Sequence, residues 1–291
     1  MAKPLRFAIV PKIAHPWFDE VHEGARSQAA LLSRELGIDI SIDYLPPPLA
    51  DAGEQNNILE KLAESHPSGV AIDPVVAPSH LKAIAHLRNR GIPVVLFDSP
   101  SPDASLPSIG NDFSEQGRIA AERLVQLIGA KGKIAVMQGY PTAPNHKARY
   151  DAQLTVLKKY PDIRIVDGGT DNDDIDVAKQ QALAVLEKHP DLTGYLCCDA
   201  SAPIGIATAL KQTGKAGKVK VVGMDGIRPI LEAIRDGILD SSSATKPRMQ
   251  GSMAILMLWE SALGIQTPQA IDTGIDVITK DNVDFYLANA A

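Results

Sequence analysis

Short apolar runs rich in Val, Ile and Leu alternate along the chain with longer segments in which apolar residues recur at helical spacing. Runs of this length are typical of parallel strands buried on both faces, and the longer segments then cover the sheet as helices. We predict strands at residues 7–11, 40–45, 69–73, 94–98, 108–111, 133–138, 164–168, 194–199, 219–224 and 240–245. We predict helices near residues 17–36, 54–66, 78–90, 114–129, 145–160, 175–188, 203–213, 228–236 and 248–263, several of them bounded by Pro at the start and Gly past the end.

The predicted elements form one β-α series that is repeated, with a break near residues 129–133. Two sheets accommodate ten strands more simply than one sheet does. The chain has 291 residues and 45% apolar content, which is enough for two α/β domains. The sequence therefore predicts an α/β fold of two similar Rossmann-like lobes with parallel sheets.

Charge and cysteine content narrow the class of partner. The formal net charge is −6 and no stretch holds five or more Lys or Arg residues, which argues against nucleic acid and against an anionic membrane surface. No apolar run approaches the ~18 residues that span a bilayer. Cys197 and Cys198 are neighbours, which disfavours a mutual disulfide, and we expect both to pack as small apolar side chains.

Polar and aromatic residues stand just beyond the predicted strands in both halves of the chain. In parallel sheets the ligand-contacting residues lie in the loops past the carboxyl ends of the strands. Asp73 follows the third strand, and the candidate ligand residues are Lys12, His15, Trp17, Phe18, Asp98, Ser99, Asn111 and Asp112 in the first half and Asn145, Arg149, Asp199, Asp225 and Thr245 in the second. We expect these groups to converge on one cleft.

This set of side chains suits a polyhydroxylated ligand. A sugar presents hydroxyl groups that both donate and accept hydrogen bonds, with weakly apolar C–H faces between them. Asp98 and Asp225 are the best candidate acceptors, and Arg149 can donate in a fork to neighbouring oxygens. Trp17 or Phe18 can stack on a sugar face.

Each candidate also has a structural alternative. Strand-end carboxylates can cap the turns that follow them, and an aromatic residue after an X-Pro turn can plug the core. Arg149 can form a surface ion pair, His15 can shape its own turn, and Lys12 can be solvated. Asn111 and Asp112 can stabilise the passage of the chain from the first lobe to the second through bonds to the backbone.

Catalytic and metal motifs are missing from the sequence. It has no G-x-G-x-x-G after the first strand, no G-x-x-x-x-G-K-[ST], no G-x-S-x-G and no H-E-x-x-H. The acidic run at residues 171–174 lacks the glycine and the distal glutamate of a calcium loop, so we interpret it as a solvated helix cap. We predict no catalytic residues, no metal ligands and no cofactor.

Several segments resemble the periplasmic sugar-binding proteins of the ribose-binding type, which serve ABC importers. The resemblance covers nearly the whole chain and rests on the order and spacing of its pieces. They are His15-Pro16-Trp17-Phe18, Gly91-Ile92-Pro93-Val94-Val95 with Asp98, Gly110-Asn111-Asp112 with Gly117, Arg149, Asp199, and Val222-Gly223-Met224-Asp225-Gly226. Ser99 replaces an arginine and Thr245 a glutamine of the family, and the chain looks more like the branch that binds rhamnose, polyols or the furanosyl signal autoinducer-2.

The resemblance implies a type I periplasmic binding protein fold with a three-strand hinge near residues 111–113, 244–247 and 273–276. The N-terminal lobe would comprise residues 1–112 and 246–275, and the C-terminal lobe residues 113–245 and 276–291, with closure around the ligand. It implies a periplasmic, monomeric protein whose partners are a sugar or polyol, the importer's membrane permease and, as a further candidate, a chemoreceptor.

Two alternatives share part of this evidence. The effector-sensing core of a sugar-responsive repressor has the same fold, but only a few residues precede the first strand. A carbohydrate-active enzyme could use a cleft of carboxylates. Residues 1–4 lead directly into the first strand without a leader pattern, so we expect either a cytoplasmic protein or, as the fold favours, a chain whose leader has been removed.

Overall fold

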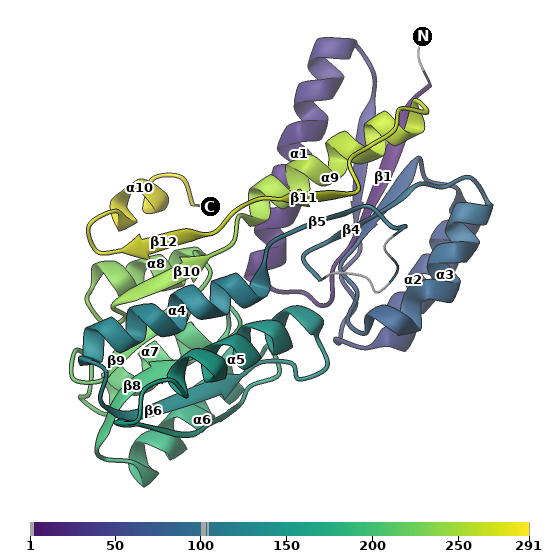
Figure 1. Cartoon of the computed structure of the whole chain (residues 1–291). Coiled ribbons are helices and arrows are strands. Elements are labelled where there is room, and N and C mark those ends of the chain that lie inside the picture. Colours follow the sequence, from purple (N-terminus) through teal and green to yellow (C-terminus); the bar gives the residue numbers. More distant parts are fainter. Residues whose placement is uncertain (1–2, 100–102, 104, 291) are drawn as a thin grey trace. The chain divides into compact units, whose positions relative to one another are not determined.

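The computed structural model describes residues 3–99, 103 and 105–290. Residues 1 and 2, which belong to the stretch considered for a leader, lie outside the described part. The chain divides into two compact α/β units. Unit 1 comprises residues 1–111 and 246–273, and unit 2 comprises residues 112–245 and 274–291 (Figure 1). The chain therefore passes between the units three times, at residues 111–112, 245–246 and 273–274, where the sequence had placed the boundaries at 112–113, 245–246 and 275–276.

Unit 1 is built on a six-stranded sheet whose order is β11-β5-β4-β3-β1-β2, with every neighbouring pair parallel. Helices α2 and α3 pack together on one face, where Leu59, Leu87 and Leu96 belong to the buried core. Helices α1 and α9 pack together over the sheet, with α9 against β3 and β4 (Figure 1). The elements are β1 (Leu5–Val10), α1 (Pro16–Leu36), β2 (Ile40–Tyr44), α2 (Ala52–Ser65), β3 (Gly69–Ile72), α3 (Ala77–Asn89), β4 (Val94–Phe97), β5 (Ser108–Gly110), α9 (Pro247–Ala262) and β11 (Ala270–Asp272).

Unit 2 repeats this plan with strand order β12-β10-β9-β8-β6-β7, in which only the β10–β12 pair is antiparallel. Helix α4 packs against α5 and against strands β8, β9 and β10, and α6 packs against α7. The elements are α4 (Phe113–Ile128), β6 (Gly132–Gln138), α5 (Pro144–Leu157), β7 (Ile163–Thr170), α6 (Ile175–Lys188), β8 (Leu192–Leu196), α7 (Ala202–Gln212), β9 (Lys220–Met224), α8 (Arg228–Arg235), β10 (Ser241–Ala244), β12 (Asp276–Thr279) and α10 (Val283–Leu287).

The observed architecture matches the predicted α/β fold of two lobes with mostly parallel sheets. The ten predicted strands and nine predicted helices are present, with ends that agree to within about three residues. The C-terminal β11, β12 and α10 were not among the predicted elements. Helix α5 ends at Leu157 rather than near 160 because Pro161 disfavours the helical conformation of Tyr160.

In the part of the chain that the structure describes, no helix combines the length and the apolar character that crossing a bilayer requires.

Candidate ligand-binding site

Asp98 and Asp225 occupy the same position in the two units. Each follows an inner strand, β4 or β9, and each has a left-handed backbone, with φ of +54° and +66°. The Asp98 amide donates to the Ile109 carbonyl at 2.9 Å, and the Asp225 amide donates to the Ser243 carbonyl at 2.9 Å. A left-handed conformation costs a residue with a side chain about 1–2 kcal/mol, so this turn is held by its surroundings. Both carboxylates are buried at the carboxyl edge of their sheets.

In unit 1 a buried ion pair lies beside Asp98. Lys12 is only 2% exposed, and its Nζ lies 3.8 Å from Oδ2 of Asp73, which is fully buried. The Ser99 amide donates to Oδ1 of Asp73 at 3.1 Å. Burial raises the pKa of Asp73 to about 7; Lys12 opposes the shift and Asp98 adds to it. Lys12 is therefore not the solvated lysine that its sequence position also allowed.

The aromatic residues of unit 1 form a buried cluster at the start of α1. Trp17 packs edge-on against Phe18 with ring centroids 5.1 Å apart, and Phe18 packs edge-on against Phe97 of β4 at 6.3 Å. Nδ1 of His15 accepts the Trp17 amide at 3.1 Å and so caps the helix. Lys12 Nζ lies 5.9 Å from the Phe18 ring. The cluster places these aromatic rings beside the Lys12–Asp73 pair.

Asn111 and Asp112 are engaged at the first passage between the units. The Asn111 amide donates to Oγ1 of Thr273 at 3.0 Å, and its carbonyl accepts from Gln250 at 3.1 Å. Asp112 is exposed and caps α4, since its Oδ1 accepts the Glu115 amide at 2.9 Å. These contacts correspond to the structural alternative that the sequence left open for both residues.

Arg149 lies on α5 and is held inside unit 2 rather than on its surface. Its Nε donates to Oε1 of Gln116 at 2.7 Å, and its Nη1 donates to the Cys198 carbonyl at 3.2 Å. The guanidinium carbon lies 4.7 Å from the centre of the Phe113 ring. With 2% exposure, Arg149 does not form the surface ion pair that its helix position also allowed.

Asp199 and Asp171 form a pair of buried acids at the ends of β8 and β7. Oδ1 of Asp199 accepts the amides of Ser201 and Ala202 at 3.0 and 2.9 Å, whereas its Oδ2 is buried with no hydrogen-bond partner among the described residues. Burial and then Asp173 raise the pKa of Asp199 to about 6. Burial and the nearby Asp199 hold the pKa of Asp171 well above its usual range. We interpret the pair as sharing a proton that Asp171 carries.

The acidic run at residues 171–174 is therefore only in part the solvated cap that we predicted. Asp174 is exposed and caps α6 by accepting the Val177 amide at 2.9 Å, but Asp171 is fully buried. Asn145 and His146 lie nearby at the start of α5, where Oδ1 of Asn145 accepts the His146 amide at 3.0 Å.

Ligand atoms of His146, Asp173 and Asp199 lie within 4.8 Å of one another, which makes this group the one to test for a metal. Nδ1 of His146 accepts the Tyr140 amide at 2.8 Å, so the ring hydrogen resides on Nε2. Nε2 then faces Oδ2 of Asp173, 3.8 Å away, as a donor. A nitrogen that carries hydrogen cannot coordinate a cation, so the arrangement suits hydrogen bonding better than metal binding.

Asp225 is tied to the second passage between the units. Its Oδ1 accepts the Thr245 amide at 3.2 Å and also accepts from the Thr245 hydroxyl. Cys197 and Cys198 are fully buried beside this edge, and burial raises the pKa of both thiols well above the usual range. Both therefore remain thiols, in keeping with a packing role.

Within each unit, the structure brings most predicted residues into one contiguous group. Sequence reasoning noted Asp73 without choosing it, and it missed Gln116, Gln250, His146 and the burial of Asp171. A repeated Gln-Gly pair, at residues 116–117 and 250–251, was the available signal for the two glutamines.

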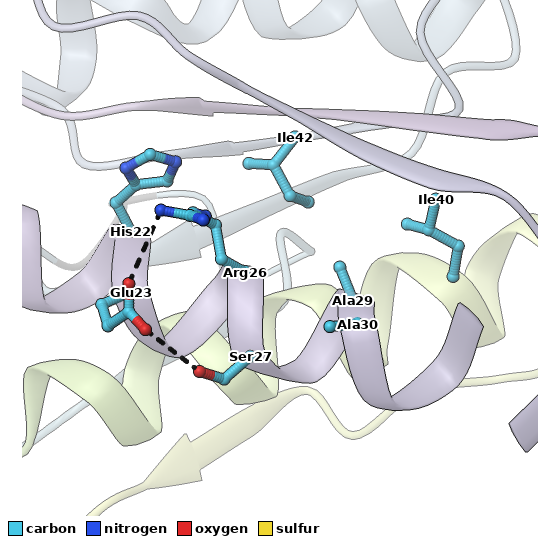
Figure 2. Close-up of a pocket in the computed structure, with 8 residues that line it drawn as sticks. All are labelled: His22, Glu23, Arg26, Ser27, Ala29, Ala30, Ile40 and Ile42. Atoms are coloured by element: carbon cyan, nitrogen blue, oxygen red, sulfur yellow. Dashed lines mark hydrogen bonds and ion pairs between the residues drawn. The ribbon is translucent and has the colours of Figure 1, made fainter. Parts of the chain in front are cut away.

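A hollow of about 520 Å³ lies elsewhere on unit 1, between α1 and β2 (Figure 2). Figure 2 shows Arg26 beside His22, with Glu23 bonded to Ser27 and paired with Arg26. His22 stacks on Tyr44 with ring centroids 4.4 Å apart. None of the predicted ligand residues lines this hollow, so we do not include it in the candidate site.

Comparison with known proteins places this geometry in a family. The chain is 24% identical to the D-allose-binding periplasmic protein of Escherichia coli over 87% of its own length and 83% of that protein. It superposes with a TM-score of 0.89 and 27% identity on an ABC transporter solute-binding protein of Burkholderia graminis in complex with D-arabinose, covering 97% of each chain. It superposes with a TM-score of 0.90 and 25% identity on one of Agrobacterium vitis with bound D-fucose, covering 98% and 99% of the two chains. The family model described as the periplasmic binding protein domain matches residues 7–266. The chain belongs to the periplasmic binding protein family.

Proposed function

We propose that this chain is the solute-binding component of an ABC importer, and that side chains from the carboxyl edges of both sheets bind one small neutral sugar or polyol. The observation that carries the proposal is the matched placement of Asp98 and Asp225, each buried, left-handed and at the end of an inner strand. A carboxylate in such a turn can accept from two adjacent hydroxyl groups. The names of the relatives, which are sugar-binding proteins of importers, support the same function.

The balance of buried charge supports a neutral ligand. In unit 1, Lys12 faces two carboxylates, Asp73 and Asp98. In unit 2, Arg149 lies near Asp199. Neither group of residues offers an excess of cations, so a sugar phosphate or a sugar acid would meet repulsion from buried acids. Hydroxyl groups can instead donate to these oxygens and accept from the lysine and the arginine.

The proposal extends to partners and location. The liganded protein would deliver its sugar to the importer's membrane permease, from the periplasm and as a monomer. A chemoreceptor is a further candidate partner. The periplasmic and transport names of the relatives support the permease and the location.

A screen of ligands tests the proposal. We would measure the melting temperature with D-allose, D-arabinose, D-fucose, D-ribose, L-rhamnose, xylitol and autoinducer-2, and then the Kd of each hit by calorimetry. A cognate ligand at one hundred times its Kd should add about 2.7 kcal/mol of stability. It should also change Trp17 fluorescence in a Trp259→Phe background. Stabilisation by a sugar phosphate, and by none of the neutral compounds, would overturn the neutral-ligand assignment.

Binding without chemistry is tested separately. The relatives named above are binding proteins, which favours a transport role over an enzyme or a repressor core. Radiolabelled sugar incubated with the protein at millimolar concentration should be recovered unchanged after release by denaturation. Appearance of a new labelled product in proportion to protein concentration would establish an enzyme instead.

A further inference from the structure

Two buried glutamines occupy equivalent places in the two units. Gln116 is the fourth residue of α4, which begins just after the first passage between the units, and Gln250 is the fourth residue of α9, which begins just after the second. Both side chains are fully buried. Each helix packs on the first helix of its unit after the first strand, α4 on α5 and α9 on α1.

A glycine follows each glutamine and sets the close approach of the helices. A Cβ at Gly117 would collide with the backbone carbonyl of Arg149 on α5. A Cβ at Gly251 would collide with the backbone carbonyl of Val21 on α1. The backbones therefore meet directly at this point, and the preceding glutamine is enclosed next to the carboxyl edge of the sheet.

The two glutamines make contacts of the same kind. Oε1 of Gln116 accepts from Arg149 Nε at 2.7 Å, while its Nε2 donates to the Ser243 carbonyl at 2.9 Å. Oε1 of Gln250 accepts the Asp98 amide at 3.0 Å, while its Nε2 donates to Oδ1 of Asn111 at 3.1 Å. In each case the carbonyl end holds a candidate ligand residue and the amide end holds the chain within two residues of a passage.

The Ser243 carbonyl extends the contact in unit 2, because it also accepts the Asp225 amide at 2.9 Å. Gln116 thus connects Arg149, Asp225 and the segment that leaves unit 2. A buried amide of this kind has little freedom to rotate, since both of its ends are bonded away from water.

We propose that Gln116 and Gln250 are positioning residues that fix Arg149 and the Asp98 turn for ligand binding and connect each of them to a passage between the units. The inference rests on the proposed function only for the ligand itself. The ordering of Arg149 and Asp98 is a property of the unliganded protein and can be measured without a sugar.

The first part of the test uses no ligand. We would compare the wild type with Gln116→Met and Gln250→Met by ¹⁵N relaxation and hydrogen exchange. Gln116→Met should increase motion and exchange at Arg149 Nε–Hε, and Gln250→Met should speed exchange of the Asp98 amide, by about tenfold or more. Gln153→Met is the matched control. It removes another fully buried amide, which donates to the Cys197 carbonyl at 2.6 Å, and should leave both signals unchanged.

The second part measures the Kd for D-allose, or for the strongest hit among the neutral compounds named above. Gln116→Met should weaken binding by roughly tenfold, the loss typical of one hydrogen bond to a charged group. Gln116→Glu keeps an acceptor for Arg149 and should recover much of the affinity, whereas Gln153→Met should bind as the wild type does. Circular dichroism and a cooperative melt establish that each variant is folded.

The outcomes separate the two proposals. Unchanged order at Arg149 and Asp98 in folded Met variants overturns the positioning role, whatever the wild type binds. Failure of the wild type to bind any neutral compound counts against the proposed function, and the relaxation data then still decide the positioning role. Equal loss of affinity in Gln116→Met and Gln153→Met would also overturn it, because a general loss of packing would then explain the effect.

Discussion

The two units solve the same problem, holding buried carboxylates at the edge of a sheet, in different ways. In unit 1 the strand-end acid Asp73 faces a cation, because Lys12 lies 3.8 Å away. In unit 2 the strand-end acid Asp199 faces another acid, Asp171, whose pKa burial and Asp199 raise well above its usual range. An ion pair keeps both partners charged, whereas two acids this close must share a proton.

The difference indicates where each unit is vulnerable. Unit 1 depends on keeping a positive charge in place, since removal of Lys12 would leave a carboxylate buried without its ion pair. Unit 2 depends on keeping a proton in place, and it uses Arg149 for a separate set of contacts with Gln116 and the Cys198 carbonyl. Asp98 and Asp225, by contrast, are built alike in both units, which is expected of groups with one shared task.

The largest effect on stability should come from Lys12→Met. At pH 8.5, above the pKa of about 7 of Asp73, the variant should lose about 3 kcal/mol or more, because it leaves a buried carboxylate unpaired. The loss should shrink at pH 6, where Asp73 can take up a proton. Guanidinium unfolding at both pH values checks this.

The matched control for Lys12 is Lys220→Met in unit 2. Lys220 pairs with Asp240 at 2.9 Å, but its side chain is 37% exposed, so the expected cost is at most about 1 kcal/mol. The double variant Lys12→Met/Asp73→Asn should recover most of the stability. A Lys12→Met protein as stable at pH 8.5 as at pH 6 would remove the charge argument for unit 1.

Asp98→Asn and Asp225→Asn test whether the similar turns have similar roles. Asparagine tolerates the left-handed backbone and has the same shape, so the fold should survive. Each change removes the charge that accepts from ligand hydroxyls and should weaken binding by roughly a hundredfold. Calorimetric titration with the best neutral sugar measures the loss.

Asp174→Asn provides the control, because this exposed acid caps α6 and asparagine caps equally well. It should bind as the wild type does. A large loss in only one of the two strand-end variants would show that the ligand is gripped mainly by one unit and would end the analogy between the two turns.

These comparisons also show how much of the fold was available from the sequence. The inner strands, such as residues 94–97 and 220–224, are continuous apolar runs between turn residues, so their position and burial followed from the pattern. Asp98 and Asp225 could be chosen because they directly follow such runs. The short β11 and the exposed residues of β12 carry no comparable pattern.

The missed residues have a different physical origin. Gln116 is polar and lies on a helix, which in sequence is typical of a solvated position. Its burial depends on Gly117, which lets α5 approach, and on Arg149 from 33 positions further along the chain. The sequence left a solvated alternative open for Lys12 for the same reason, because Asp73 lies far from it along the chain. Contacts made by tertiary packing leave no periodic trace.

Gly117→Ala and Gly251→Ala sharpen the comparison of the helix pairs. Each added methyl would press on the carbonyl of the facing helix, Arg149 or Val21, and should cost about 1–3 kcal/mol. Ser114→Ala on α4 and Met249→Ala on α9 are exposed and should change stability by less than about 0.5 kcal/mol. Thermal unfolding monitored by circular dichroism measures all four variants.

Equal costs at the two glycines would indicate that both helix pairs are equally rigid. If Gly117→Ala proves neutral, α4 and α5 can separate without loss, and the enclosure of Gln116 would be weaker than that of Gln250.

The smallest expected effect is the pH dependence of stability, which should differ between the units. Burial raises the pKa of Asp73 to about 7 and that of Asp199 to about 6. A group with a raised pKa binds its proton more tightly in the folded chain, so stability falls as pH rises from about 4 through the raised pKa. Burial lowers the pKa of His80 in unit 1 to about 4, and this group makes stability rise between about 4 and 6.5.

The contributions of Asp73 and His80 oppose each other in unit 1 up to about pH 6.5, so its decline should be confined to a narrow range near pH 7. In unit 2 both members of the acid pair have raised pKa values, so their contributions add and the decline should begin near pH 4. Scanning calorimetry from pH 4 to 8 should therefore show that Asp171→Asn, whose amide can replace the shared proton, flattens the lower part of the profile. Asp73→Asn should flatten only the part near pH 7. If both variants flatten the same range, the two units do not differ in how they hold their acids, and the contrast between an ion pair and a shared proton is wrong.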